Sequence, residues 1–121
     1  MKIAVSSTGD NLESDVDMRF GRCKYFMIVE SDSMDFNAIS NESVMASGGA
    51  GIKAAETIVN QDAEIVLTGN IGPNAHRTLS AAGIKVFTGA AGTIKEAINK
   101  YKNNELNETG SANVDSHNGM R

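Results

Sequence analysis

The sequence predicts an α/β fold, on three observations. Its 121 residues are enough for one compact domain and too few for two of ordinary size. Short apolar runs alternate with segments whose apolar residues recur at helical spacing. Glycine-rich loops separate the two kinds of segment in the second half of the chain. The predicted order is β-β-β-α-β-α-β-α, with strands at 2–6, 25–29, 34–39, 64–68 and 85–88 and helices beginning near residues 51, 73 and 94.

The first half of the chain is dominated by strands. Ile3, Ala4 and Val5 form a continuous apolar run, which is typical of a buried strand. A polar stretch over residues 7–23 follows, and loops of this length inside compact domains are often functional. The turn-forming residues 31–33 then separate two β-rich segments, which predicts an antiparallel hairpin.

Capping signals mark the helices of the second half. Pro73 suits the first position of a helix, and Gly83 suits a helix end. Thr93 and Glu96 have the spacing of a capping box, which predicts the start of the last helix. Residues 103–121 are rich in Asn, Glu, Ser and Gly, so we expect a disordered tail, including His117, after a domain of residues 1–102.

The composition excludes several classes of protein. The net charge of −4 and the shortage of aromatic residues argue against a nucleic-acid partner, which would favour a basic, base-stacking surface. No apolar run approaches the roughly 20 residues that span a membrane, and no signal peptide is recognisable. Cys23 is the single cysteine, which excludes an intrachain disulfide and suits a reducing cytoplasm. We therefore expect a soluble cytoplasmic protein.

The predicted topology brings the loops together. Strand–helix–strand crossovers are right-handed and make their strands parallel. If strands one, three, four and five are parallel, strand two is antiparallel to them, and Cys23 at its start lies at the edge where the four other strands end. Ligands of open α/β sheets bind outside the carboxyl ends of the strands. The sequence therefore predicts a ligand site at this edge.

Two glycine-rich loops, 47–51 and 68–76, lead into helices at that edge. Glycines before a helix let backbone N–H groups approach an anion, and the helix N-terminus adds a partial positive charge. Neither loop has the dinucleotide-binding or the P-loop pattern, and a tight turn is the alternative interpretation.

Cys23 and His76 are the candidate metal ligands. Arg19 and Arg22 lie shortly before Cys23, which would favour a thiolate able to bind a soft metal, whereas a lone buried cysteine is the alternative. His76 follows the second glycine-rich loop and could bind a soft or borderline metal, unless it is a hydrogen-bonded histidine of the fold. One Cys and one His do not complete a zinc site, and no serine hydrolase pattern accompanies them.

Three segments, in this order, carry a family resemblance: Arg19-Phe20-Gly21-Arg22, Ser47-Gly48-Gly49-Ala50-Gly51 and Gly72-Pro73-Asn74-Ala75. They resemble the dinitrogenase iron–molybdenum cofactor biosynthesis family, which includes NifX-like domains, NifB C-terminal domains and the small orange protein. The resemblance covers residues 1–102. It implies a ribonuclease-H-like α/β/α layering with a five-stranded mixed sheet, but the carboxylates of a ribonuclease are not recognisable, so we expect no nuclease activity.

The resemblance also implies non-catalytic binding or carriage of an anionic metal–sulfur cluster. The cluster would be the iron–molybdenum cofactor, its precursor or a molybdenum–copper sulfide, and other cluster-assembly proteins would be partners. Cys23 and His76 are then the expected metal ligands. The expected cluster-binding residues are Arg19, Phe20, Gly21, Arg22, Gly48, Gly49, Gly51, Gly72 and Asn74. Three alternatives are a regulatory domain for a small molecule or phosphate, an enzyme with Cys23 as nucleophile, and an interaction module.

Overall fold

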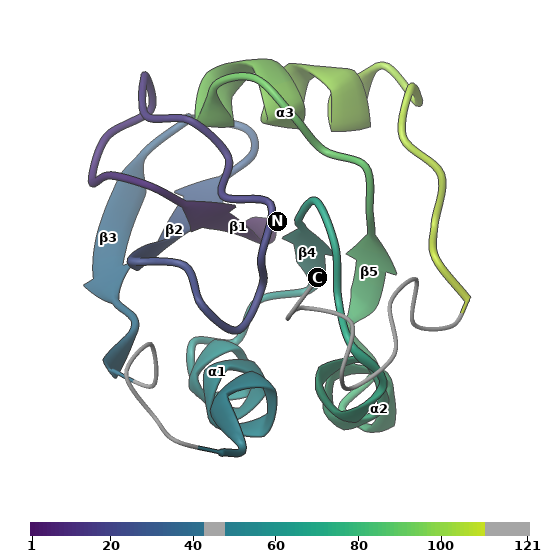
Figure 1. Cartoon of the computed structure of the whole chain (residues 1–121). Helices are drawn as coiled ribbons and strands as arrows, with labels where there is room; N and C mark the ends of the chain where they lie inside the picture. The colour runs from purple at the N-terminus through teal and green to yellow at the C-terminus, as the bar shows by residue number, and fades with distance from the viewer. Residues whose placement is uncertain (43–47, 111–121) are drawn as a thin grey trace.

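The computed structural model describes residues 1–42 and 48–110, which form three layers. A five-stranded sheet lies between helices α1 and α2 on one face and helix α3 on the other (Figure 1). The strands are β1 (Lys2–Ser7), β2 (Tyr25–Glu30), β3 (Phe36–Ser40), β4 (Ile65–Leu67) and β5 (Lys85–Phe87), and the helices are α1 (Ala50–Asn60), α2 (Pro73–Ala81) and α3 (Ile94–Lys102). The predicted α/β class and element order are confirmed.

The strand order across the sheet is β3-β2-β1-β4-β5. β2 runs antiparallel to both β1 and β3, whereas β1, β4 and β5 are parallel to one another. Val5 of β1 pairs with Met27 on one side and with Leu67 on the other, so β1 is the centre of a mixed sheet. The carboxyl ends of β1, β3, β4 and β5 consequently face the same side.

The third strand begins two residues later than predicted. Met34 has φ 65, in the left-handed region that interrupts an extended strand. It belongs instead to the turn between β2 and β3, where its N–H donates to Glu30 O at 2.8 Å and Glu30 N–H donates to Asp35 O at 2.8 Å. The prediction of a strand from residue 34 is therefore wrong at its start.

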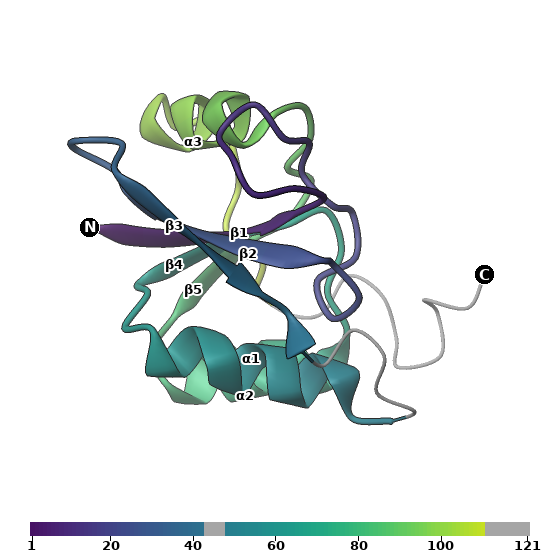
Figure 2. The same ribbon diagram turned by 90° about the vertical axis from the view of Figure 1, so that its left-hand side faces the viewer.

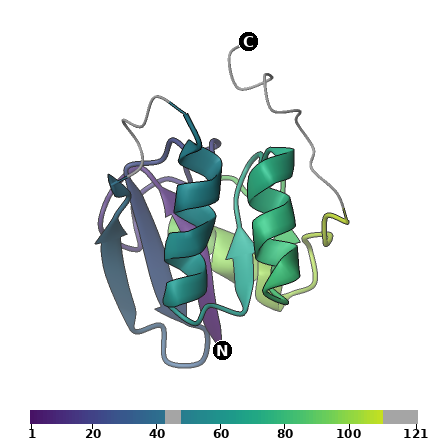
Figure 3. The same cartoon turned by 90° about the horizontal axis from the view of Figure 1, so that it is seen from below.

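Apolar residues on both faces of the strands build two cores. Ala4, Ile28 and Val66 face α1 and α2, where they pack with Ala54 and Leu79 among other buried residues. Their neighbours in the strands, including Val5, Val29 and Leu67, face α3 and pack against Ile94 and Ile98. Because β1 is buried on both faces, its sequence is a continuous apolar run and does not alternate with polar residues. Figure 3 shows α1 and α2 side by side in front of the sheet.

The segment 103–110 follows α3 and lies along β5, contrary to the predicted disorder. Thr109 N–H donates to Val86 O at 2.7 Å, and its hydroxyl lies 2.6 Å from the Thr88 hydroxyl. The carbonyl oxygen of Thr109 lies 2.9 Å from His76 Nε2. Leu106 also packs against the core on the α3 side, so hydrogen bonds and apolar contact together hold this part of the predicted tail. Residues 111–121, with His117, lie outside the described residues, as does Ser47 of the first glycine-rich loop.

No helix in the described ranges is both long enough and apolar enough to cross a membrane.

Candidate functional site

One end of the molecule collects the loops that the sequence singles out. The loop after β1, the loop after β4 and the N-termini of α1 and α2 all lie at the carboxyl ends of the parallel strands (Figure 2). We call this end the loop edge, defined by residues 17–23, 48–51 and 69–75. The predicted convergence of these three segments is therefore found in the backbone.

Backbone hydrogen bonds hold residues 17–20 against the loop after β4. Asn70 N–H donates to Met18 O at 2.8 Å, and Phe20 N–H donates to Asn70 O at 3.2 Å. Beneath them, the Ser6 hydroxyl donates to Asp17 O at 2.7 Å and lies 2.7 Å from the Thr68 hydroxyl. The loop after β1 is thus fixed to the ends of two strands.

Two glycines permit close packing at this edge. A Cβ atom on Gly21 would lie 3.1 Å from the Gly51 Cα atom, and one on Gly51 would lie 3.4 Å from the Ala75 Cβ atom. The first turn of α1 is therefore packed between the loop after β1 and the first turn of α2. Gly21 and Gly51, which the sequence suggested as ligand-binding, have a structural reason to be glycine.

Three other glycines border open space. A Cβ atom on Gly48, Gly49 or Gly72 would meet nothing within 4 Å among the described atoms. Gly49 also has φ 70, a conformation that favours glycine. Among the described atoms, these three positions leave space beside the starts of α1 and α2.

The N-termini of α1 and α2 lack side-chain caps. Gly49 and Gly72 are the N-cap residues, and within the described residues neither helix has a capping side chain or an acidic residue in its first turn. The first N–H groups of a helix have no intrahelical acceptor, and the helix dipole adds a partial positive charge there. Two such ends at one edge suit an anion.

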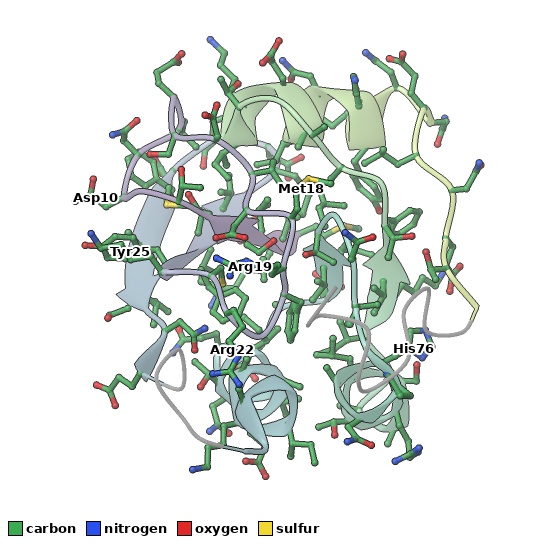
Figure 4. All side chains as sticks on the ribbon, viewed as in Figure 1. Asp10, Met18, Arg19, Arg22, Tyr25 and His76 are labelled. Atoms are coloured by element: carbon green, nitrogen blue, oxygen red, sulfur yellow. The ribbon has the colours of Figure 1, made fainter. Side chains whose placement is uncertain are left out.

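Arg19 and Arg22 add positive charge. Figure 4 shows both side chains at the loop edge, with Arg22 toward α1. The Arg19 side chain is 63% exposed, and its Nε lies 3.5 Å from Asp17 Oδ1. A planar guanidinium presents several N–H donors to an anion. The Asp17 carboxylate partly offsets the charge of Arg19.

Cys23 does not match its predicted role. Its side chain is fully buried in the core under α1 and α2, and Sγ donates to Phe20 O at 3.3 Å. Burial, with a smaller effect from the Asp17 carboxylate, raises the pKa of the Cys23 thiol to about 12. Burial thus opposes the thiolate that Arg19 and Arg22 were expected to favour, and the assignment of Cys23 as a metal ligand stays a prediction.

Phe20 is also a core residue. Its side chain is 2% exposed and packs against Phe26, with the ring centroids 5.1 Å apart. Phe20 therefore anchors the loop between the two arginines, and its ring does not line the loop edge.

His76 and Asn74 lie on α2. His76 is half-buried, hydrogen-bonded to Thr109, and Figure 4 shows it well apart from Arg19 and Arg22. Asn74 is exposed, and its Oδ1 accepts a hydrogen bond from Arg77 at 3.3 Å. Cys23 and His76 do not come together as a pair of ligands. Within the described ranges, no group of three or more His, Cys, Asp or Glu side chains could hold a metal ion.

Sequence reasoning missed Asn41. This residue is 2% exposed, and its Nδ2 donates to Gly21 O at 3.2 Å and to Cys23 O at 2.9 Å. Asn41 thereby fixes the arginine-bearing loop to the end of β3. The available signal was a polar amide directly after a strand at the predicted loop edge, but nothing local distinguishes it from a solvated loop residue.

The fold defines a small three-layer α/β/α domain, and its loop edge presents backbone amides and arginines. The family model for the dinitrogenase iron-molybdenum cofactor matches residues 1–104. The chain belongs to this family.

Individual relatives agree with that assignment. The chain is similar to the apo form of the orange protein from Desulfovibrio gigas, with 35% identity, a TM-score of 0.90 and coverage of 93% of this chain and 95% of that one. A NifB-like protein from Thermotoga has 34% identity, a TM-score of 0.78 and coverage of 88% and 91%. An uncharacterised protein of Methanocaldococcus jannaschii is 30% identical over 109 residues, covering 88% of this chain and 89% of the relative.

Proposed function

We propose that this protein binds and carries an anionic metal–sulfur cluster at the loop edge, as an accessory to metallocluster assembly and without catalysing a reaction. The observation that carries the proposal is a pair of helix N-termini that begin at glycines and have no side-chain cap among the described residues. Both lie at the loop edge, with Arg19 and Arg22. Membership of the dinitrogenase iron-molybdenum cofactor family supports a cluster as the cargo.

The donor set favours contacts to the outside of a cluster over direct metal ligation. The Cys23 thiol is buried and protonated at neutral pH, and His76 is engaged with Thr109 away from the arginines. Amide N–H groups and guanidinium groups can instead donate to the sulfides of an anionic cluster. A cargo held in this way can be taken up and released intact, which suits a carrier. The iron–molybdenum cofactor, its precursor and a molybdenum–copper sulfide are all anionic clusters with sulfides that could accept such hydrogen bonds.

Incubation with tetrathiomolybdate tests the proposal. Apoprotein is mixed with tetrathiomolybdate, with and without copper(I), and passed over a desalting column under anaerobic conditions. We expect protein fractions to retain visible absorption and molybdenum. Absence of both, with these anions and with a nitrogenase cofactor precursor, would contradict the proposal.

Charge-matched variants locate the binding. The double variant Arg19→Gln/Arg22→Gln removes two positive charges from the loop edge, and we expect weaker retention. Lys100→Gln/Lys102→Gln removes the same charge from the last turn of α3. Equal losses in the two double variants would indicate a general charge effect and argue against a site at the loop edge.

A phosphate or small-molecule binder is the second candidate function. The open N-termini of α1 and α2 favour it, because such helix ends accept phosphate as readily as other anions. This function predicts that phosphate or a nucleotide raises the melting temperature without any metal, through preferential binding to the native state. An enzyme with Cys23 as nucleophile has no comparable support, because the thiol is buried.

A further inference from the structure

Met18 exposes a large apolar side chain at the loop edge. Met18 is 46% exposed and directly precedes Arg19 in the chain, and both residues are labelled in Figure 4. Met1 and Phe36, which are exposed to a similar degree, belong to the opposite end of the sheet. Met18 therefore adds apolar, sulfur-bearing surface to the loop edge, which is otherwise built from amides and arginines.

The position of Met18 is well fixed. Its carbonyl oxygen accepts from Asn70 N–H at 2.8 Å, which holds the backbone to the loop after β4. Its side chain packs on Gly69, where a Cβ atom would lie 2.6 Å from Met18 Cε and 2.8 Å from Met18 Sδ. The thioether therefore occupies the space that a side chain at position 69 would fill. These contacts fix the position of the Met18 side chain at the surface.

The neighbours of Met18 give this surface a mixed character. Arg19 follows Met18 directly in the chain and pairs with Asp17, so the loop edge carries both a cationic donor and a polarisable sulfur. Oxyanions are strongly hydrated, and contact with an apolar group costs them water that nothing replaces. Sulfide-bearing anions are more diffuse and weakly hydrated, and thioethers are soft, polarisable partners. The two kinds of anion should therefore differ in their response to Met18.

We infer that Met18 is a specificity-determining residue of the loop edge: its thioether contacts the bound anion and favours a sulfide-bearing metal anion over an oxyanion of equal charge and shape. This inference rests on the proposed function. It explains why a site otherwise built from amides and arginines, which would accept phosphate, would select a metal–sulfur cargo.

Tetrathiomolybdate and molybdate form a matched pair of probes, because both are tetrahedral dianions of molybdenum and differ in sulfur against oxygen. The dissociation constant of each is measured for the wild-type protein, for Met18→Asn and for Met34→Asn. Met34 is the control, since it lies in the turn at the other end of β2 and its φ of 65 is tolerated by asparagine. We expect Met18→Asn to lower the preference for tetrathiomolybdate by about fivefold, from the loss of apolar contact, and Met34→Asn to leave it unchanged.

A measurement on the wild-type protein does not depend on the variants. With methionine methyl groups labelled with carbon-13, titration with tetrathiomolybdate should shift the Met18 resonance and leave that of Met34 in place. An unchanged preference in folded Met18→Asn, or an unmoved Met18 methyl resonance at saturation, would overturn the inference while the proposed function stands. Failure of the wild-type protein to bind tetrathiomolybdate at all would instead overturn the proposed function.

Discussion

The N-terminus of α3 differs from those of α1 and α2, although all three helices begin after loops of the same sheet. Thr93 caps α3, its hydroxyl accepting from Glu96 N–H at 3.1 Å while Glu96 Oε1 accepts from Thr93 N–H at 2.9 Å. α1 and α2 begin at glycines with no such side chain among the described residues. The fold can therefore cap a helix end fully, and it leaves two ends available on the face where the arginines lie.

The capping box distinguishes the N-terminus of α3 from those of α1 and α2, which the proposed function assigns to anion binding. The capping box gives the first N–H groups of α3 acceptors and places a carboxylate on the positive end of its dipole. An anion at the start of α3 would therefore have to compete with the Thr93 and Glu96 side chains. At α1 and α2 the same N–H groups have no side-chain cap within residues 1–42 and 48–110, and a bound anion would supply acceptors. The following predictions test this contrast.

The largest expected effect is on stability and concerns Gly69, on which Met18 packs. A Cβ atom there would lie 2.7 Å from Met18 Cα, so Gly69→Ala forces the loop after β1 away from the loop after β4. We expect the free energy of unfolding to fall by about 3 kcal/mol in a urea titration. Gly72→Ala is the control, because open space surrounds Gly72, and it should cost less than about 1 kcal/mol. Equal losses would mean that the two glycines do not differ as the geometry indicates.

The thiol of Cys23 predicts a pH dependence that involves no ligand. Its pKa is raised from 9.0 to about 12 in the native protein by burial. An unfolded chain loses this proton above pH 9, so the stabilisation is complete below pH 9 and is lost as the pH rises toward 12. We expect the free energy of unfolding to fall by up to about 1.4 kcal/mol per pH unit in this range.

Cys23→Ala supplies the comparison for that slope, since lysines and tyrosines also titrate at high pH. The variant should be less stable overall but should show a shallower decline between pH 9 and 11. Identical slopes would contradict burial of the protonated thiol. Retention of tetrathiomolybdate by this variant is also expected, because the proposed contacts do not include the thiol.

Capping α2 should convert a ligand-facing end into a structural one. Gly72 has the extended conformation of an N-cap residue, φ −86 and ψ 170, so Gly72→Asp can place a carboxylate over the first N–H groups. We expect the free energy of unfolding to rise by about 0.5 kcal/mol, while the affinity for tetrathiomolybdate falls about tenfold through competition and repulsion. If calorimetry shows an unchanged affinity of Gly72→Asp for tetrathiomolybdate, the N-terminus of α2 is not part of the binding site.

The smallest expected effect is the reverse change at α3. Thr93→Ala removes the cap and should lower the free energy of unfolding by about 1 kcal/mol. Because α3 has no part in the proposed site, the dissociation constant of tetrathiomolybdate should stay within about twofold of the wild-type value. A larger loss of affinity would break the distinction between the two kinds of helix end.

Local signals explain what could be predicted from the sequence. The capping box at Thr93 and the position of Pro73 at the start of α2 depend only on neighbouring residues, and both are confirmed. The mixed sheet followed from the order of the elements. The start of β3 was misplaced because the left-handed conformation of Met34 has no signature in composition.

Tertiary contacts explain what could not be predicted. The burial of Cys23 depends on the packing of α1 and on Asn41 from the end of β3, neither of which is visible near residue 23. The order of residues 103–110 depends on Thr109 meeting Thr88 and His76, which are remote in sequence. The convergence of the glycine-rich loops was predictable because it follows from strand direction, whereas the division of those glycines into packing and open positions required the structure.

Backbone amide NMR, with unlabelled tetrathiomolybdate titrated into nitrogen-15-labelled protein, tests the central claim most directly. The account predicts the largest shifts at the amides of residues 48–52 and 74–75, at the starts of α1 and α2, with little change at residues 93–96 of α3. Largest shifts at the start of α3, or shifts spread evenly over the surface, would contradict an anion site at the loop edge.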